Sequence, residues 1–163
     1  MLINSTMTTN VDYVMIYFKY PVPNPINGEP TNKTIKRLKQ ELRANASSVE
    51  TDLEGGDHGY LGLYLSDAEY ASIIPQPTRF EAPAWPGALA INPTATAVEA
   101  VHAKEAHHEA MRIYRECKNI EKALLRHTQN ALEHKYIETL LNDDTGLIEL
   151  DLPTVTVLRR KLR

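Results

Sequence analysis

The chain has 163 residues, of which 42% are hydrophobic and 24% charged, and it carries a formal net charge of −3. This length and composition favour one globular domain and argue against wholesale disorder, and the negative charge disfavours strong binding of nucleic acid by the whole surface. Its single cysteine, Cys117, excludes an internal disulfide framework and a cysteine-rich zinc site.

Residues 1–30 are expected to form an extended N-terminal segment. No basic residue precedes Lys19, and the apolar run 11–18 is too short to span a bilayer, so we expect a cytoplasmic protein with neither a secretory signal nor a membrane segment. The stretch VDYVMIYF is β-branched and aromatic, which favours a short strand. The following YPVPNPINGEP is rich in proline, which favours an extended linker.

A helical domain is expected over residues 31–163, and its first helix starts at Thr31 or Asn32. Apolar residues recur there at steps of three and four: Ile35, Leu38, Leu42, Ala46 and Val49. The opposite face is basic, with Lys33, Lys36, Arg37, Lys39 and Arg43. Such a face could contact RNA or acidic lipid, but an ordinary solvated face is favoured, because Glu41 and the acidic loop after Val49 offset its charge.

The central part of the chain is predicted to hold one short helix and a long loop. We expect GYLGLYL to be extended, and SDAEYASII to be a helix that starts at the capping box of Ser66 and Glu69 and ends before Pro75. Residues 75–95 contain six residues of proline or glycine and should form a proline-rich loop. Phe80 and Trp85 are expected to anchor either this loop on the core or a partner on the loop, and the core is favoured because a large exposed aromatic side chain lowers solubility.

The longest helix is predicted to begin at a second capping box, formed by Thr96 and Glu99. Its apolar stripe is Ala103, Ala106, Ala110, Ile113, Cys117, Ile120, Leu124 and Ala131. Because asparagine caps helices well, the sequence also allows a break near 118–119. A further helix is expected around 133–142, with Tyr136 and Ile137 facing inward, and a last one from Pro153. The predicted fold class is therefore mainly α, a single domain of five to six helices.

The stretch EGGDHG, residues 54–59, does not match a phosphate-binding loop. Its glycines fit neither the P-loop nor the dinucleotide-binding spacing, no lysine follows, and Glu54 and Asp57 would repel phosphate. We therefore predict a structural turn in which Gly55, Gly56 or Gly59 adopts a positive φ.

A histidine cluster on the long helix raises the possibility of a metal. His102, Glu105, His107 and His108 lie close in sequence, and Glu105 with His108 has the E-x-x-H spacing of di-iron bundles. Those bundles need a second such motif, which the sequence lacks, and neighbouring histidines point in different directions on a helix. A polar helix face is favoured, and no catalytic, cofactor or metal site is predicted; the alternative is a small cytosolic metal-binding or enzymatic helical protein that uses this cluster.

Five segments in this order resemble the gag-like proteins of copia-type retrotransposons, especially those of diatoms and other algae. They are LKQELRANASSV, GGDHGYLGLYLSDAEYASI, PAWPGAL, HHEAMRIYRECKNIEKALLRHTQNALEHKYIETLLNDDTG and LDLPTVTVLRRKL, and the resemblance covers roughly residues 35–158. The resemblance implies a non-enzymatic, capsid-like helical domain that self-associates around RNA. The chain departs from a full gag protein, because one cysteine cannot make a zinc knuckle and Leu141 stands where the capsid homology pattern has arginine.

The expected partners are other copies of the chain and RNA. RNA binding should be weak, sensitive to salt and indifferent to sequence. The residues expected to contact RNA are Lys36, Arg37, Arg43, Arg159, Arg160, Lys161 and Arg163. Self-association is expected to form a homo-oligomer through a helix face rich in small or apolar residues, or through the loop that carries Trp85.

Overall fold

The structure is a computed structural model that describes residues 11–53, 56–74 and 80–138. Within these ranges the chain forms six α-helices and one 3-10 turn, with no strand, so the mainly α fold class is confirmed. The predicted helix from Pro153 and the C-terminal part of the helix expected at 133–142 lie outside the described residues.

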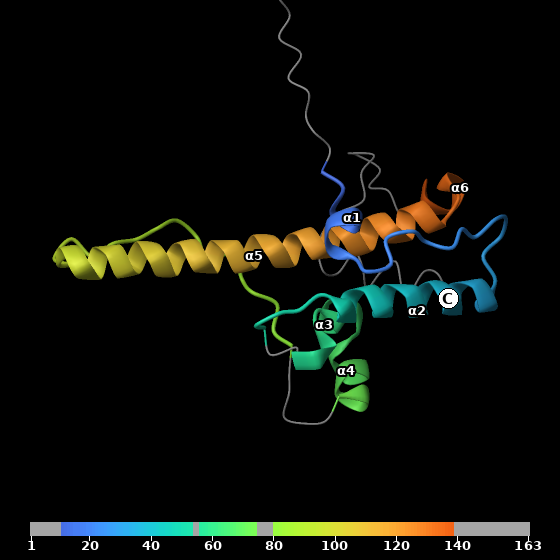
Figure 1. Ribbon diagram of the computed structural model, residues 1–163, viewed down its shortest axis with the longest axis horizontal. Helices are drawn as coiled ribbons and strands as arrows, with labels where there is room; N and C mark the ends of the chain where they lie inside the picture. Colours follow the sequence, from blue (N-terminus) through green and yellow to red (C-terminus); the bar gives the residue numbers. More distant parts are fainter. Residues whose placement is uncertain (1–10, 54–55, 75–79, 139–163) are drawn as a thin grey trace, which may run out of the picture.

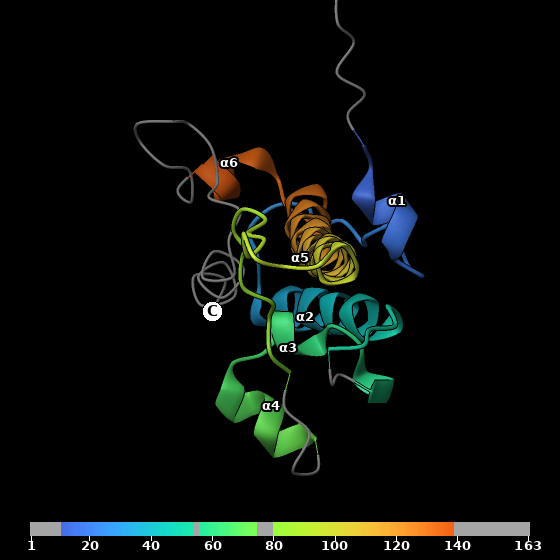
Figure 2. The ribbon, with the colours of Figure 1, turned by 90° about the vertical axis from the view of Figure 1, so that its left-hand side faces the viewer.

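Two antiparallel helices, α2 (Asn32–Ser48) and α5 (Ala97–Ala131), form the centre of the molecule, and both views show them side by side (Figures 1 and 2). Both begin as predicted, each at a threonine whose side chain accepts a backbone N–H of the first turn. Most of the buried residues between them are apolar, and they include Leu38, Leu42, Ala46, Ile120 and Leu124.

Helix α5 is continuous from Ala97 to Ala131, so the break that the sequence allowed near 118–119 does not occur. Ile120, the residue after Asn119, is fully buried, and Cys117, about one turn before it, is buried too. Burial of apolar side chains on both sides of Asn119 therefore outweighs the modest capping preference of asparagine.

The strand predicted at VDYVMIYF is instead the short helix α1 (Tyr13–Tyr17), which packs against α5. The Asp12 carboxylate accepts the backbone N–H of Met15 at 3.4 Å and caps the turn. Val14 and Phe18 are four residues apart and both buried, a spacing that suits one face of a helix. After α1 the chain lacks helix up to Thr31, as predicted, and Ile26 forms an isolated parallel bridge with Leu132.

The segment GYLGLYL, predicted to be extended, contains the helix α3 (Leu61–Tyr64). Every large side chain of this segment is buried, so the alternation of buried and exposed residues that identifies a strand is absent: Tyr60, Leu61, Leu63, Tyr64 and Leu65. The 3-10 turn (Gly56–His58) precedes it, and α4 (Asp67–Ile73) follows it with the predicted capping box of Ser66 and Glu69.

The helix α6 (His134–Ile137) begins where a helix was predicted, and Ile137 is buried as expected. Tyr136 is half-buried. The helix follows α5 directly and ends the described part of the chain, and Figure 2 shows it on the opposite side of α5 from α1.

Candidate interaction surface

The N-terminal half of α5 projects beyond the rest of the molecule (Figure 1). The buried residues of α5 all lie from Met111 onward, so none of the side chains at 97–110 belongs to the core. We call residues 97–110 the α5 arm. A helix that leaves the core and continues for several turns exposes surface that is available to a partner.

The proline-rich loop runs along this arm and is attached to α5 at two points. The rings of Trp85 and Tyr114 lie edge to face with centroids 5.3 Å apart. The backbone carbonyl of Gly87 lies 2.9 Å from Nε2 of His107, within hydrogen-bond distance. The loop then enters α5 through a turn in which the Ala95 N–H donates to the carbonyl of Asn92.

Four large apolar side chains of the arm and its loop are exposed: Trp85, Leu89, Val98 and Val101. We call these four residues the arm surface. Trp85 is 59% exposed, so the prediction that it anchors on the core was wrong, whereas the same prediction for Phe80 is confirmed. The indole meets the Tyr114 ring in an edge-to-face contact, and much of its own surface stays exposed.

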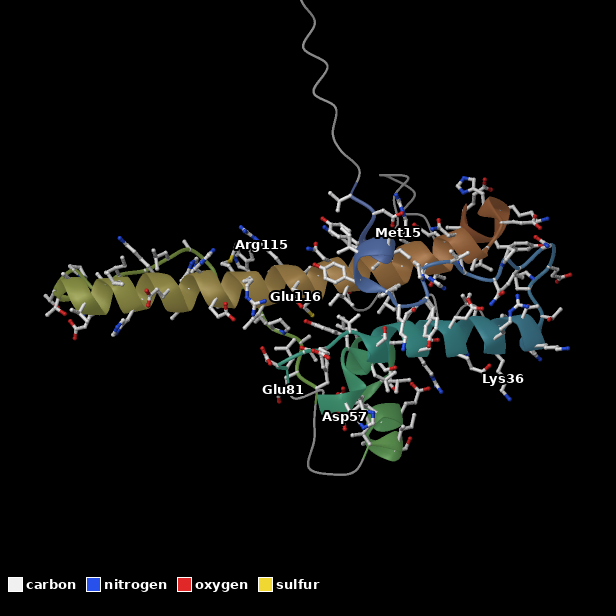
Figure 3. All side chains as sticks on the ribbon, in the orientation of Figure 1. Met15, Lys36, Asp57, Glu81, Arg115 and Glu116 are labelled. Carbon is white, nitrogen blue, oxygen red and sulfur yellow. The ribbon has the colours of Figure 1, made fainter. Side chains whose placement is uncertain are left out.

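A second exposed apolar group lies on and beside α1. Its members are Val11, Met15, Ile16, Tyr20 and Val22, and we call them the α1 surface. Met15 and Ile16 are each 62% exposed, because Val14 and Phe18 take the side of the helix that faces α5. Met15 and Lys36 lie on opposite sides of the two-helix core (Figure 3).

The residues predicted to contact RNA do not form one described cluster. Lys36 is exposed and points away from the core (Figure 3). Arg37 is exposed but donates to the carbonyl of Pro25 at 3.3 Å, and Arg43 is half-buried. Arg159, Arg160, Lys161 and Arg163 lie outside the described residues.

The histidine cluster is spread over several sides of the arm. His102, Glu105 and His108 are exposed, whereas His107 turns to the carbonyl of Gly87. Among the described residues, no group of three or more histidine, cysteine, aspartate or glutamate side chains is placed to hold a metal ion. The described residues also contain no helix long and apolar enough to cross a membrane.

A polar pocket of about 180 Å³ lies between the loop after α2 and the part of α5 around residues 112–116. It is lined by Glu50, Thr51, Asp52, Leu53, Tyr60, Arg112, Ile113 and Glu116. Arg112 forms ion pairs there with Glu109 and Glu116, at 2.7 and 2.9 Å.

Two titratable groups at or near this pocket keep their protons at neutral pH. Burial raises the pKa of Tyr60 to about 12 and the pKa of the nearby Cys117 thiol to about 12.

Of the three glycines predicted to shape the turn, Gly59 has the positive φ, +49°. A Cβ at Gly59 would collide with the carbonyl oxygen of Val49 and would lie 2.9 Å from that of Ser47. Gly56 starts the 3-10 turn, and Gly55 lies outside the described residues. The turn therefore brings the chain back against the last turn of α2, where only a hydrogen fits.

Sequence reasoning missed a polar cluster between α2 and α5, formed by the half-buried Glu41 with Asn45 and His127. Asn45 and His127 are both fully buried, and they are 82 residues apart in the chain. The sequence signal for such a cluster is a polar residue on an otherwise apolar stripe, which Asn45 provides beside Leu42 and Ala46.

Comparisons of the chain with protein-family models, with curated proteins and with solved structures found no match.

Proposed function

We propose that this chain is a gag-like, non-enzymatic structural protein of a copia-type retrotransposon, which self-associates in the cytoplasm and binds RNA weakly. The order of the five segments quoted above supports the family. The helical fold class is compatible with a capsid-like domain, although many unrelated proteins are also helical.

The observation that carries self-association is the arm surface. Val98 and Val101 are 64% and 50% exposed, and they lie three residues apart, on the same side of a helix that leaves the core. Burying such side chains against another copy removes apolar area from water, which stabilises an interface by about 25 cal/mol for each Å².

The two apolar surfaces lie on different elements of the chain. A contact that joins the arm surface of one copy to the α1 surface of the next would be heterologous, and heterologous contacts build rings or open filaments instead of stopping at a dimer. A particle-forming protein needs contacts with more than one neighbour, and two separate surfaces would provide them.

RNA binding is expected to be weaker than self-association. The net charge of −3 opposes a polyanion, so contacts must come from local basic residues such as Lys36. Each phosphate contact on single-stranded RNA would contribute about −0.7 to the slope of log affinity against log salt. A few contacts would therefore give a shallow salt dependence.

Sedimentation velocity tests this proposal, with the purified chain measured over a wide concentration range, with and without single-stranded RNA of mixed sequence. We expect oligomers whose proportion rises with protein concentration, and a further shift with RNA that weakens as salt increases. A strictly monomeric protein in both series would contradict the gag-like function.

A further inference from the structure

The segment that joins α1 to α2 is fastened to both central helices, and we call its residues 18–28 the strap. The side-chain amide of Asn45, on α2, bonds both backbone groups of Tyr20: Oδ1 accepts the Tyr20 N–H at 3.1 Å and Nδ2 donates to the Tyr20 carbonyl at 2.9 Å. Farther along, the N–H of Ile26 donates to the carbonyl of Ala131, at the end of α5, at 2.7 Å.

Glu41, one turn before Asn45 on α2, fastens the middle of the strap. Its carboxylate accepts the backbone N–H of Asn24 at 3.3 Å and also a hydrogen bond from the Asn24 side-chain amide. Arg37 adds a bond to the carbonyl of Pro25 and lies 4.0 Å from Glu41.

His127, on α5, contacts both of the α2 residues that hold the strap. Its side chain is 1% exposed, its Nδ1 lies 3.4 Å from Nδ2 of Asn45, and its Nε2 lies 3.4 Å from Oε2 of Glu41. The imidazole also meets the ring of Phe18, at the start of the strap, edge to face at 6.1 Å.

These contacts fix which nitrogen of His127 carries the proton. The two bonds to Tyr20 set the orientation of the Asn45 amide, because only Oδ1 can accept from the N–H and only Nδ2 can donate to the carbonyl. Nδ2 therefore faces His127 as a donor, and Nδ1 of the imidazole must accept. The ring is then neutral, with its hydrogen on Nε2 directed at Glu41.

We propose that the cluster of Asn45, His127 and Glu41 is a pH-sensitive latch that holds the strap on α2 and α5, and that protonation of His127 loosens the strap. A proton added at Nδ1 turns an acceptor into a donor and sets it against the N–H of Asn45. Asn45 must then rotate or withdraw, and either movement breaks its two bonds to Tyr20.

The charges around the ring define the pH range of this device. Glu41 favours the protonated ring, and Arg37 lies behind that carboxylate, while the strap presents the neutral residues Phe18 and Asn24. Burial is the larger effect and lowers the pKa of His127 below its ordinary value of 6.5. The buried ring in the closed form therefore binds a proton less readily than an exposed ring in the open form. The closed form is fully favoured above pH 6.5, and this preference is lost as the pH falls below that value, because the open form then gains a proton first.

Hydrogen exchange followed by mass spectrometry tests the latch, with wild-type protein and two variants compared between pH 7.5 and 5.5. His127→Gln removes the titrating group, and His134→Gln is the matched control, because the His134 side chain is 77% exposed. After correction for the intrinsic pH dependence of exchange, we expect protection of residues 18–28 to fall about tenfold per unit of pH below the ordinary pKa in wild type and in His134→Gln. Protection in His127→Gln should stay constant.

Three results would overturn the proposal: constant strap protection in wild type, an equal fall in His127→Gln, or simultaneous loss of protection in the strap and in residues 117–131, which would mean global unfolding. Nuclear magnetic resonance of the wild-type protein provides a second measurement if His127→Gln does not fold. The proton on Cε1 of His127 and the amide proton of Tyr20 should then shift with one common midpoint, and separate midpoints would refute the latch.

Discussion

Gly59 combines a left-handed backbone with close contact to the end of α2, so the residue at this position is strongly restricted. In Gly59→Ala, the positive φ costs about 1–2 kcal/mol and the collision with the carbonyl of Val49 adds about 1–3 kcal/mol. We therefore expect the free energy of unfolding to fall by about 2–5 kcal/mol, measured by urea denaturation.

Gly28→Ala is the matched control for this prediction. Gly28 also has a positive φ, +76°, but nothing lies within 4 Å of the position where its Cβ would be. Only the backbone term of about 1–2 kcal/mol should then apply. Equal losses in the two variants would show that the α2 carbonyls move aside and that the close approach at Gly59 costs nothing.

Among the elements, the α5 arm should be much less stable than the rest of its own helix. Residues 97–110 contribute no side chain to the core, whereas Ile120, Ala123 and Leu124 are completely buried. Local opening of a helix costs little where few apolar contacts must break. We expect backbone amides at 101–106 to exchange at least about a hundredfold faster than those at 120–125, measured in dilute solution by hydrogen exchange.

Protein concentration supplies the control for that measurement. If the arm is covered by a second copy, protection at 101–106 should rise with concentration while protection at 120–125 stays the same. Equal protection of both segments at the lowest concentration would contradict the view of the arm as a helix outside the core.

The elements that were predicted correctly have a strong local signal. α2, α4 and α5 each combine a capping residue with apolar residues at helical spacing, and both features lie within a few turns of chain. The short helix α3 has no side-chain cap, and in α1 the cap Asp12 is followed by only one pair of buried residues at helical spacing. The β-branched and aromatic composition of α1 resembles a strand, and tertiary packing on α5 decides its structure instead.

The candidate surfaces were predictable only in part. The loop of Trp85 was recognised as a possible contact region, but the exposure of its indole depends on where α5 places Tyr114, which no local pattern encodes. The latch was missed for the same reason. His127 and Glu41 are 86 residues apart, and each reads as an ordinary helix residue until α2 and α5 are packed together.

At the scale of the whole molecule, the apolar surfaces and the basic residues occupy different parts of the chain. The arm surface lies at the projecting end of α5, and Lys36 lies on the side of α2 that faces away from α5 (Figures 1 and 3). If self-association and RNA binding both occur, this separation predicts that each can be weakened without affecting the other, because distant sites contribute additively.

A pair of double variants tests this independence. Val98→Gln with Val101→Gln removes the apolar side chains of the arm and keeps helix propensity, while Lys33→Gln with Lys36→Gln removes two exposed charges of α2. The first should weaken self-association at least about tenfold, since two buried valines contribute more than 1.4 kcal/mol, and leave RNA affinity of the monomer unchanged. The second should leave self-association unchanged and make the slope of log RNA affinity against log salt shallower by about 1.4, which corresponds to two phosphate contacts.

Two outcomes would contradict these expectations. Self-association that survives the valine variant would assign the interface to the α1 surface or to residues outside those described. An unchanged salt slope in the lysine variant would exclude this part of α2 from RNA binding.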